Sequence, residues 1–519
     1  MIADRLPRSG IRPRATSNWL GMHARFRPDA EALVEIVPGV PDRRWTYAQA
    51  YDRSLRWAAR LEQEGVRQGD RVAVLAQNTI ETFALLFACA ERGAVLVPLN
   101  WRLTPVELAW QLARTRPTAV LGDREFLPVL QALHPGLPSL PTPLSLEAGP
   151  ESDPSEGPGS ALDAPWVILF TSGSTGKPKG ALLSHAQLHW NALNTVLACD
   201  LTAADSTLTF TPLFHTGGLN CLSSPLLHRG GRVVVTRGFD AAEALRVIEQ
   251  ERITTLMGVP TIFQMMAEQK GFARADLSCV RDALCGGAPL SVPLLRLYLS
   301  RGIPLRQGFG LTEVGPNCFS MPAADAERKA GSVGMPIHHV DAQLVRPDGT
   351  RCGTDEPGEL ILGGPAVCSG YFEDPEGTAR SLTDGWFHTG DVLTRDAEGF
   401  FWVVGRIKEM FISGGENVYP AEVEAALLQC SGVREAAVVG VPDPRWGEVG
   451  AAWVTVDAVR MGEEPGDGRV VERVLSELRC RIAKYKVPKM IQVESELPRT
   501  ASGKIDKPLL RSRIHPGTP

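Results

Sequence analysis

Short apolar runs alternate with amphipathic stretches from about residue 66 onward, and this alternation constrains the fold more than any other feature of the chain. Apolar residues at helical spacing recur between runs that are short enough for single strands. The expected elements are strands over residues 71–75, 94–98 and 118–121 and helices over residues 80–92 and 105–114. Strands that alternate with helices form β-α-β units, so the pattern predicts a largely parallel sheet.

The same alternation returns between residues 240 and 310, which predicts a second half of the same kind. Asp240 is placed to cap a helix over residues 241–251, a strand follows over residues 254–259, and a further helix covers residues 291–301. Between the halves, residues 146–165 are rich in proline, glycine, serine and acidic residues. That composition is typical of a surface loop, which here leads to a strand over residues 166–170.

The last third of the chain has a different pattern of apolar and turn-forming residues. Residues 331–404 carry short apolar runs split by turn sequences such as Pro-Asp-Gly at residues 347–349, which predicts a small antiparallel or barrel-like unit. The helical and strand patterns after Gly405 are enough for a small separate α+β domain. The expected fold is α/β. A large N-terminal domain over residues 1–405 combines two parallel α/β subdomains with the small β-barrel-like unit, and a C-terminal domain covers residues 406–519.

Composition excludes several classes of protein. A chain of 519 residues with 44% hydrophobic and 22% charged residues is typical of a soluble globular protein with more than one domain. The net charge of −5 argues against a nucleic-acid-binding surface, and no apolar run reaches the ~18–20 residues that span a bilayer. The basic N-terminus lacks the apolar segment of a secretory signal, and the ten cysteines contain no CxxC pair. Buried thiols and a cytoplasmic location are therefore expected.

A glycine- and hydroxyl-rich segment follows the strand expected over residues 166–170. Backbone N–H groups of glycines can curl round an anion, hydroxyl groups add donors, and a lysine adds charge. The residues that could hold a phosphate in this way are Thr171, Ser172, Gly173, Ser174, Thr175, Gly176 and Lys177. Only two residues separate Gly173 from Gly176, and Pro178 follows Lys177, so the segment is not a Walker A loop. With a further strand expected over residues 181–184, it predicts a phosphate-gripping hairpin.

Residues 171–180 resemble the signature of the acyl-adenylate-forming superfamily, which includes acyl-CoA synthetases, peptide-synthetase adenylation domains and firefly-type luciferases. Further similar motifs follow in the family's order along most of the chain. The resemblance implies that a carboxylate attacks the α-phosphate of magnesium-bound ATP to give acyl-AMP and pyrophosphate. It also implies catalytic roles for Thr171 and Lys177 and a mobile C-terminal domain.

Two further segments resemble the family's nucleotide site. In the family, the backbone of a segment like residues 286–289 and an aromatic ring like that of Phe309 sandwich the adenine, although tyrosine is more common than phenylalanine. Glu313 would hold Mg²⁺ together with Thr175, because a hard carboxylate suits a hard cation. The positions that the resemblance assigns to nucleotide binding here are Gly286, Gly287, Ala288, Pro289, Phe309, Gly310 and Thr312.

Three more segments resemble the family's ribose site, domain junction and adenylation loop. Asp391 would accept both ribose hydroxyls, because a carboxylate has two acceptor oxygens. Arg406 would contact the ribose–phosphate end of the nucleotide, and Lys408 would be the hinge. Lys504 follows a Ser-Gly turn and resembles the adenylation lysine, whose ammonium bridges the substrate carboxylate and the α-phosphate.

His215 bears on both the acid and the acceptor. Amino-acid-activating members of the superfamily carry an aspartate where this chain has His215 and Thr216, so an amino acid is not expected. A neutral imidazole at this point resembles the aromatic gate of acyl- and aryl-CoA ligases, which predicts coenzyme A as the acceptor. The residues expected to meet CoA are Gly414, Gly415, Trp446 and Lys486.

The acid is expected to have an uncharged tail. The candidate pocket residues are Leu219, Asn220, Met257, Gly258, Val259, Thr261, Cys285 and Gly310. Because they are mostly apolar, a medium- or long-chain fatty acid is the prediction, and an aryl acid of the phenylpropenoate or benzoate type is the alternative. An acyl-AMP ligase that loads a separate carrier protein and a non-catalytic nucleotide-binding module are the rivals, and a homodimer is one expectation for the assembly.

Overall fold

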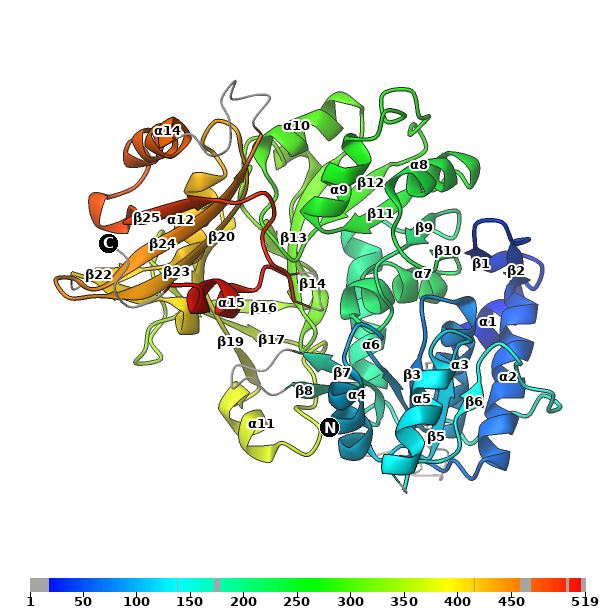
Figure 1. Ribbon diagram of the computed structural model, residues 1–519. Helices are drawn as coiled ribbons and strands as arrows, with labels where there is room; N and C mark the ends of the chain where they lie inside the picture. Colours follow the sequence, from blue (N-terminus) through cyan, green and yellow to red (C-terminus); the bar gives the residue numbers. More distant parts are fainter. Residues whose placement is uncertain are drawn as a thin grey trace, which may run out of the picture.

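The computed structural model of the protein describes residues 18–137, 139–171, 178–414, 416–457, 468–500 and 504–514. Two large sheets and their helices form most of the N-terminal domain, and two smaller sheets follow along the chain (Figure 1). The first of these smaller sheets completes the large domain, and the second builds the small C-terminal domain. The expected α/β fold with a large and a small domain is confirmed.

The first large sheet has six strands in the order β6-β5-β3-β4-β7-β8. Its neighbouring strands are parallel except β7 and β8, which form an antiparallel hairpin with Thr171 opposite Lys179. The hairpin expected around the phosphate-loop motif is therefore present. The strands are β3 (Arg71–Leu75), β4 (Val95–Pro98), β5 (Ala119–Gly122), β6 (Leu144–Ser145), β7 (Pro165–Thr171) and β8 (Lys179–Ser184).

The second large sheet has nine strands in the order β15-β14-β13-β12-β11-β9-β10-β1-β2. Its centre is parallel, and its two edges are antiparallel. The edge strands β1 and β2 come from the start of the chain, ahead of the first sheet, so this half is not one continuous stretch of sequence. The strands are β1 (Glu31–Ile36), β2 (Arg43–Thr46), β9 (Ser206–Thr209), β10 (Arg232–Thr236), β11 (Thr255–Gly258), β12 (Asp282–Cys285), β13 (Leu305–Leu311), β14 (Gly315–Ser320) and β15 (Met335–Pro336).

Helix ends in the large domain follow capping residues in the sequence. The carboxylate of Asp240 accepts a hydrogen bond from the backbone N–H of Glu243 at 2.8 Å, so the expected cap is confirmed. The strand β11 is shorter than expected because Pro260 opens a helix directly after it. The helices are α1 (Trp19–Phe26), α2 (Tyr47–Gln63), α3 (Ile80–Arg92), α4 (Pro105–Thr115), α5 (Leu127–Leu133), α6 (His185–Ala198), α7 (Ser223–Arg229), α8 (Ala241–Gln250), α9 (Pro260–Ala267) and α10 (Val292–Ser300).

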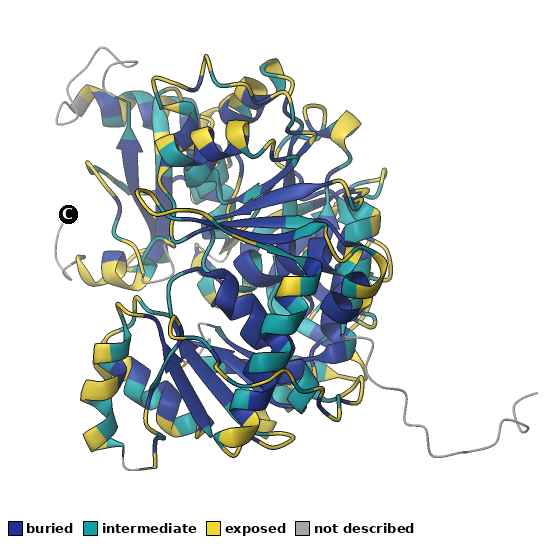
Figure 2. Ribbon diagram, turned by 90° about the vertical axis from the view of Figure 1, so that its right-hand side faces the viewer, coloured by how far each residue is buried: buried dark blue, intermediate teal, exposed yellow. Residues whose placement is uncertain are grey.

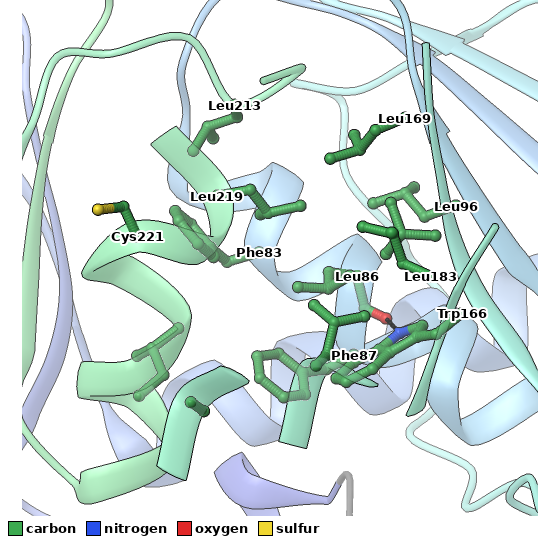
Figure 3. Close-up of a cluster of buried hydrophobic side chains, with 14 of the residues drawn as sticks. Phe83, Leu86, Phe87, Leu96, Trp166, Leu169, Leu183, Leu213, Leu219 and Cys221 are labelled. Atoms are coloured by element: carbon green, nitrogen blue, oxygen red, sulfur yellow. Dashed lines mark hydrogen bonds between the residues drawn. The ribbon is translucent and has the colours of Figure 1, made fainter. Parts of the chain in front are cut away.

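The helix α3 joins the two halves through a shared hydrophobic core. It is apolar on nearly all sides, as expected for a helix covered on every face. Figure 2 shows buried helices between the sheets. In Figure 3, Phe83 and Phe87 of α3 lie among Trp166 of the first sheet and Leu219 of the second half. The indole of Trp166 donates to the backbone oxygen of Leu86 at 2.8 Å, which fixes the sheet against the helix.

The two smaller sheets are mostly antiparallel, which for the first of them agrees with the prediction from its turn-rich sequence. The third sheet contains β16 (Asp341–Val345), β17 (Gly358–Gly363), β18 (Leu382–Thr383), β19 (Trp386–Arg395) and β20 (Phe401–Arg406), with the helix α11 (Pro375–Ser381). The sheet of the C-terminal domain contains β21 (Phe411–Ser413), β22 (Glu416–Val418), β23 (Val433–Asp443), β24 (Gly447–Val456) and β25 (Met490–Val493), with the helices α12 (Pro420–Leu427), α14 (Gly468–Arg479) and α15 (Lys507–Ser512).

All ten cysteines are free, so the predicted thiols are confirmed, and most of them are buried. Throughout the described ranges, every helix is too short or too polar to cross a bilayer.

Candidate active site

The phosphate-loop hairpin supplies the first residue of the site. Thr171 ends β7, and its hydroxyl donates to Oε1 of Glu313 at 3.4 Å. The structure thus brings the start of the loop to the carboxylate that was predicted to hold Mg²⁺. Seven predicted site residues lie outside the described residues, and their roles stay predictions: Ser172, Gly173, Ser174, Thr175, Gly176, Lys177 and Gly415.

Glu313 is a nearly buried carboxylate with several supports. The hydroxyl of Tyr371 donates to its Oε1 at 2.9 Å. The backbone N–H of Cys368 donates to its main-chain oxygen at 2.7 Å, and the amide of Gln187 donates to the same oxygen at 3.2 Å. Tyr371 and Gln187 were not predicted, because nothing in the sequence near either residue points to a partner more than fifty positions away.

A metal ion at Glu313 would meet few protein ligands. Among the described residues, no group of three or more His, Cys, Asp or Glu side chains is placed to hold a metal. A lone carboxylate suits Mg²⁺, which is commonly bound through one or two carboxylates together with substrate phosphates. The donor set of Glu313 therefore fits the predicted cation.

The predicted adenine platform lies on the ends of β12 and β13. A Cβ built on Gly286 would meet only the backbone oxygen of Gly308, at 3.5 Å, so the two segments lie side by side with open space beside Gly286. Gln307 ties them together, because its amide donates to Ala288 O at 3.2 Å and its oxygen accepts from Leu290 N at 2.7 Å. The ring of Phe309 is half-buried and makes an edge-to-face contact with Phe319, with 5.7 Å between the ring centroids.

Gly310 occupies a position that only glycine can fill. A Cβ at this residue would lie 2.1 Å from the backbone oxygen of Pro316, because β13 and β14 approach closely there. Its neighbour Thr312 is half-buried, and the amide of Gln187 donates to its backbone oxygen at 3.3 Å. The nucleotide segment is therefore held by the backbone of β14 at Gly310 and by the side chain of Gln187 at Thr312.

Asp391 and Arg406 face each other across β19 and β20. The Nε atom of Arg406 lies 2.7 Å from Oδ1 of Asp391, while Oδ2 is buried without a partner among the described residues. Burial raises the pKa of the Asp391 carboxyl above its ordinary value, and Arg406 opposes that rise. A buried acceptor oxygen left unpaired in this way fits the predicted role of accepting a ribose hydroxyl.

Lys504 lies close to these groups although it comes from the C-terminal domain. Surrounding protein lowers the pKa of its ammonium mainly by desolvation and then through Arg406, while the carboxylates of Asp391 and Glu313 raise it. The side chain remains accessible to solvent. The structure therefore brings together four of the predicted residues, Lys504, Asp391, Arg406 and Glu313, which are spread over the last two-fifths of the chain.

His215 lies near the same cluster and carries no charge at neutral pH. Burial lowers its pKa to about 4, and the positive charges of Lys504 and Arg102 add to this effect. Its Nε2 is buried with no partner in the described part of the chain. The side-chain amide of Asn78 holds the segment that precedes His215. Its NH₂ group donates to Thr211 O and its oxygen accepts from Leu213 N, each at 3.0 Å. Asn78 and Arg102 were not predicted.

Some of the residues predicted to line the acid pocket are buried, and others are only half-buried. Leu219 and Cys285 are fully buried and belong to hydrophobic clusters, as Figure 3 shows for Leu219, so they support the fold. Asn220 is also buried, and its amide donates to Thr216 Oγ1 at 3.3 Å. Met257 is half-buried, and its methyl group lies 3.1 Å from where a Cβ on Gly217 would stand. Met257 therefore packs against the turn at Gly217, two residues after His215.

The residues predicted to meet CoA gather elsewhere. Gly414 N donates to Trp446 O at 2.9 Å, and a Cβ on Gly414 would lie 2.8 Å from the indole ring, so the ring packs against bare backbone. Arg445 and Lys489 lie near the same ring, at 5.1 and 5.9 Å from its centroid. Lys486 instead pairs with Glu422. In Figure 1, the neighbouring strand β22 lies at the edge of the C-terminal domain that faces away from the large domain.

Comparison with known proteins shows the family to which the chain belongs. The model of the family described as AMP-binding enzyme matches residues 21–372, and the model of the AMP-binding enzyme C-terminal domain matches residues 422–504. A feruloyl-CoA synthase of an Amycolatopsis species is 41% identical over 97% of this chain and 100% of its own length. An indoleacetate–CoA ligase of Aromatoleum aromaticum is 40% identical over 96% of this chain and 98% of its own.

A solved structure extends the similarity to three dimensions. The o-succinylbenzoate coenzyme A synthetase of Bacillus subtilis, in complex with ATP and magnesium, aligns with a TM-score of 0.83 at 31% identity and covers 96% of this chain and 98% of its own. The similarity thus extends over nearly the whole chain. The chain belongs to the AMP-binding enzyme family within the acyl-adenylate-forming superfamily, and it is an acid–thiol ligase of the acyl-CoA synthetase branch.

Proposed function

We propose that the protein converts an aryl carboxylic acid to its CoA thioester through an acyl-AMP intermediate. The observation that carries the reaction is the gathering of Lys504, Asp391, Arg406 and Glu313 beside a neutral His215. The choice of acid rests on the relatives that share about two residues in five with this chain, which are named for ferulate and indoleacetate. The sequence analysis predicted a fatty acid, with an aryl acid as the alternative. The aryl acid is therefore the substrate that we propose.

In the first step a carboxylate oxygen of the acid bonds to the α-phosphorus of ATP, and the bond from that phosphorus to the pyrophosphate oxygen breaks. The ammonium of Lys504 stabilises the charge that develops between the two reactants. Asp391 orients the nucleotide through its unpaired Oδ2, and Arg406 holds Asp391 in place. Glu313, with Thr171 and Thr175, would hold Mg²⁺, which neutralises phosphate charge when bound.

In the second step the CoA thiol attacks the acyl carbonyl carbon and AMP leaves. We assign the domain boundary to residues 405 and 406, with Lys408 as the pivot. Rotation about this pivot would withdraw Lys504 and turn Gly414 and Trp446 toward the candidate active site. Such closure is an ordinary way to run two reactions in one site. His215 would lie between the acid and the thiol. Its neutral imidazole ring would turn aside and leave room for the pantetheine arm.

A panel of acids in a CoA-dependent AMP-release assay tests the proposal. We expect phenylpropenoates, benzoates or indoleacetate to give the highest kcat/KM, and medium- and long-chain fatty acids to give lower values. A preference for a fatty acid would overturn the aryl assignment. Equal AMP release with and without CoA would favour delivery of the acyl group to a carrier protein, and no acid-dependent pyrophosphate exchange at all would indicate a non-catalytic nucleotide-binding module.

Replacing Lys504 by alanine separates the two steps. Acid-dependent exchange between pyrophosphate and ATP should fall about 10²-fold or more, because a key electrostatic donor is lost. Thioester formation from supplied acyl-AMP and CoA should persist. The exposed Lys270, replaced by alanine in the same way, is the matched control and should leave both reactions unchanged. An equal fall in both half-reactions in the Lys504 variant would contradict the alternation of domains.

A further inference from the structure

A half-buried charge network lies outside the candidate active site, at the entrance to the C-terminal domain. The ammonium of Lys507, in the first turn of α15, lies 3.0 Å from Glu409 and 2.8 Å from Glu424. Oε1 of Glu424 also accepts a hydrogen bond from Val438 N at 2.7 Å, which ties the network to β23. The Lys507 ammonium therefore forms ion pairs with two carboxylates.

The charges in this network depend on one another. Burial raises the pKa of Glu424, and Lys507 opposes that rise. The two carboxylates raise the pKa of Lys507 in spite of its burial, and Lys507 holds the pKa of Glu409 below its ordinary value. Removing Lys507 would leave the half-buried Glu424 without its paired cation beside a second carboxylate, while Glu409 would keep only the more distant charges of Arg406 and Lys408.

The positions of the three residues along the chain link separate parts of the domain. Glu409 follows Lys408 directly and closes the short 3₁₀ turn Ile407–Glu409, where the chain enters the domain. Glu424 belongs to α12, the first helix of the domain. Lys507 stands three residues after Lys504. The network thus connects the pivot, the body of the domain and the segment that carries the adenylation lysine.

The turn that carries Lys504 has anchors of its own on the C-terminal sheet: Arg499 pairs with Glu435 of β23, and Leu497 and Ile505 pack in a hydrophobic cluster with β23 and β24. Its arms are joined by backbone hydrogen bonds from Thr500 N to Lys504 O and from Asp506 N to Pro498 O, each 2.8 Å. These contacts shape the turn and hold it against the sheet, but none of them reaches the pivot. Beyond the turn, Leu510 is buried, and Lys507 makes the ion pairs that lie closest to Lys504 along the chain.

We propose that Lys507 is a positioning residue for adenylation: through Glu409 and Glu424 it holds the Lys504 turn at a fixed place relative to the pivot. Closure of the domain then delivers the Lys504 ammonium to the cleft. The inference rests on the proposed function of Lys504. It also implies that Glu409 rotates with the C-terminal domain, so the pivot lies at or before Lys408.

The test compares Lys507→Met with Lys329→Met in the full chain. Lys329 is the matched control, because its ammonium also pairs with two carboxylates, Asp396 at 2.7 Å and Glu398 at 2.6 Å, but within the large domain. For Lys507→Met we expect pyrophosphate exchange to fall about 10²-fold, the usual effect of a small misplacement of a catalytic group. Thioester formation from supplied acyl-AMP and CoA should stay within a few fold of wild type, and Lys329→Met should change neither reaction.

Two further variants keep the test decisive if Lys507→Met does not fold. Lys507→Arg retains a cation that can bond both carboxylates and should restore most of the exchange activity. Glu409→Gln leaves the pair of Lys507 and Glu424 intact and should lower exchange by a smaller factor, again without an equal loss of thioester formation. Circular dichroism of each variant checks the fold.

The outcomes separate this inference from the proposed function. Equal loss of both half-reactions in folded Lys507→Met or Glu409→Gln, or wild-type exchange in both variants, would overturn the positioning role. Exchange that is absent in wild type with every acid would refute the proposed function instead, and Lys507 would then be a structural anchor only.

Discussion

At the scale of single residues, the candidate active site depends on side chains that hold its polar groups in place. Glu313 accepts from Tyr371, and the ammonium of Lys179 lies 4.6 Å from the centre of the Tyr371 ring. Burial and the adjacent carboxylate of Glu313 both raise the pKa of the Tyr371 hydroxyl, so it stays a hydrogen-bond donor at neutral pH. Tyr371 therefore orients the carboxylate that is proposed to hold Mg²⁺.

Replacing Tyr371 by phenylalanine should weaken the use of magnesium-bound ATP. A hydrogen bond to a charged group contributes about 1.5–3 kcal/mol, so the KM for Mg·ATP should rise about 10- to 100-fold at fixed acid concentration. Titration of Mg²⁺ and ATP in the exchange assay measures the effect. Tyr298→Phe is the matched control, because the hydroxyl of Tyr298 donates to Phe263 O at 2.7 Å in the core of the second half. A similar rise in KM in both variants would mean that stability, not orientation, is responsible.

At the scale of elements, the local sequence predicts whether a segment forms a helix or a strand. It predicts less well which other elements that segment will contact. The helix over residues 80–92 is found with the predicted bounds, and Thr79 and Gly93 cap its two ends. In contrast, the loop that carries His215 is held by Asn78, which precedes α3 in the other half of the domain. Its conformation depends on contact between the two halves, which no local pattern encodes.

Replacing Asn78 by alanine should therefore alter the reaction as well as stability. Loss of both amide hydrogen bonds frees the segment from Thr211 to Leu213, so His215 should lose its fixed place. We expect kcat/KM for the acid to fall about 10-fold or more, in line with the cost of a small misplacement. Asn18→Ala, which removes the N-cap of α1, is a control for stability alone. An unchanged kcat/KM in a folded Asn78 variant would show that the loop holds its shape without the amide.

At the scale of the whole molecule, histidines in the shared core couple stability to pH. His185 is fully buried and stacks on Trp166 with ring centroids 4.7 Å apart. Burial lowers its pKa to about 3, and burial also lowers that of His228 to about 4. Between pH 6.5 and these values the unfolded chain binds protons that the folded protein does not, so stability falls as pH falls through this window.

The apparent thermal midpoint should therefore drop between pH 7.5 and pH 5. His185 alone should contribute about 2 kcal/mol of that loss at pH 5, since one pKa unit corresponds to about 1.4 kcal/mol. His185→Gln should flatten the dependence of the midpoint on pH, even if it lowers the midpoint at pH 7.5. His338→Gln, at an exposed site, should leave the slope as in wild type. A slope unchanged by His185→Gln would contradict the assignment.

The sequence alone determined the kinds of elements and the two α/β halves, which follow from periodicity and caps within a few residues of one another. Its resemblance to the family also pointed to Glu313, Asp391 and Lys504 as the residues proposed to carry the chemistry. Only the tertiary structure decided that β1 and β2 join the second sheet, that Leu219 and Cys285 serve the core, and that Tyr371 supports Glu313. The same holds for the link from Lys507 to Glu409. Such contacts join residues tens to hundreds of positions apart, and they exist only once packing has brought the elements together.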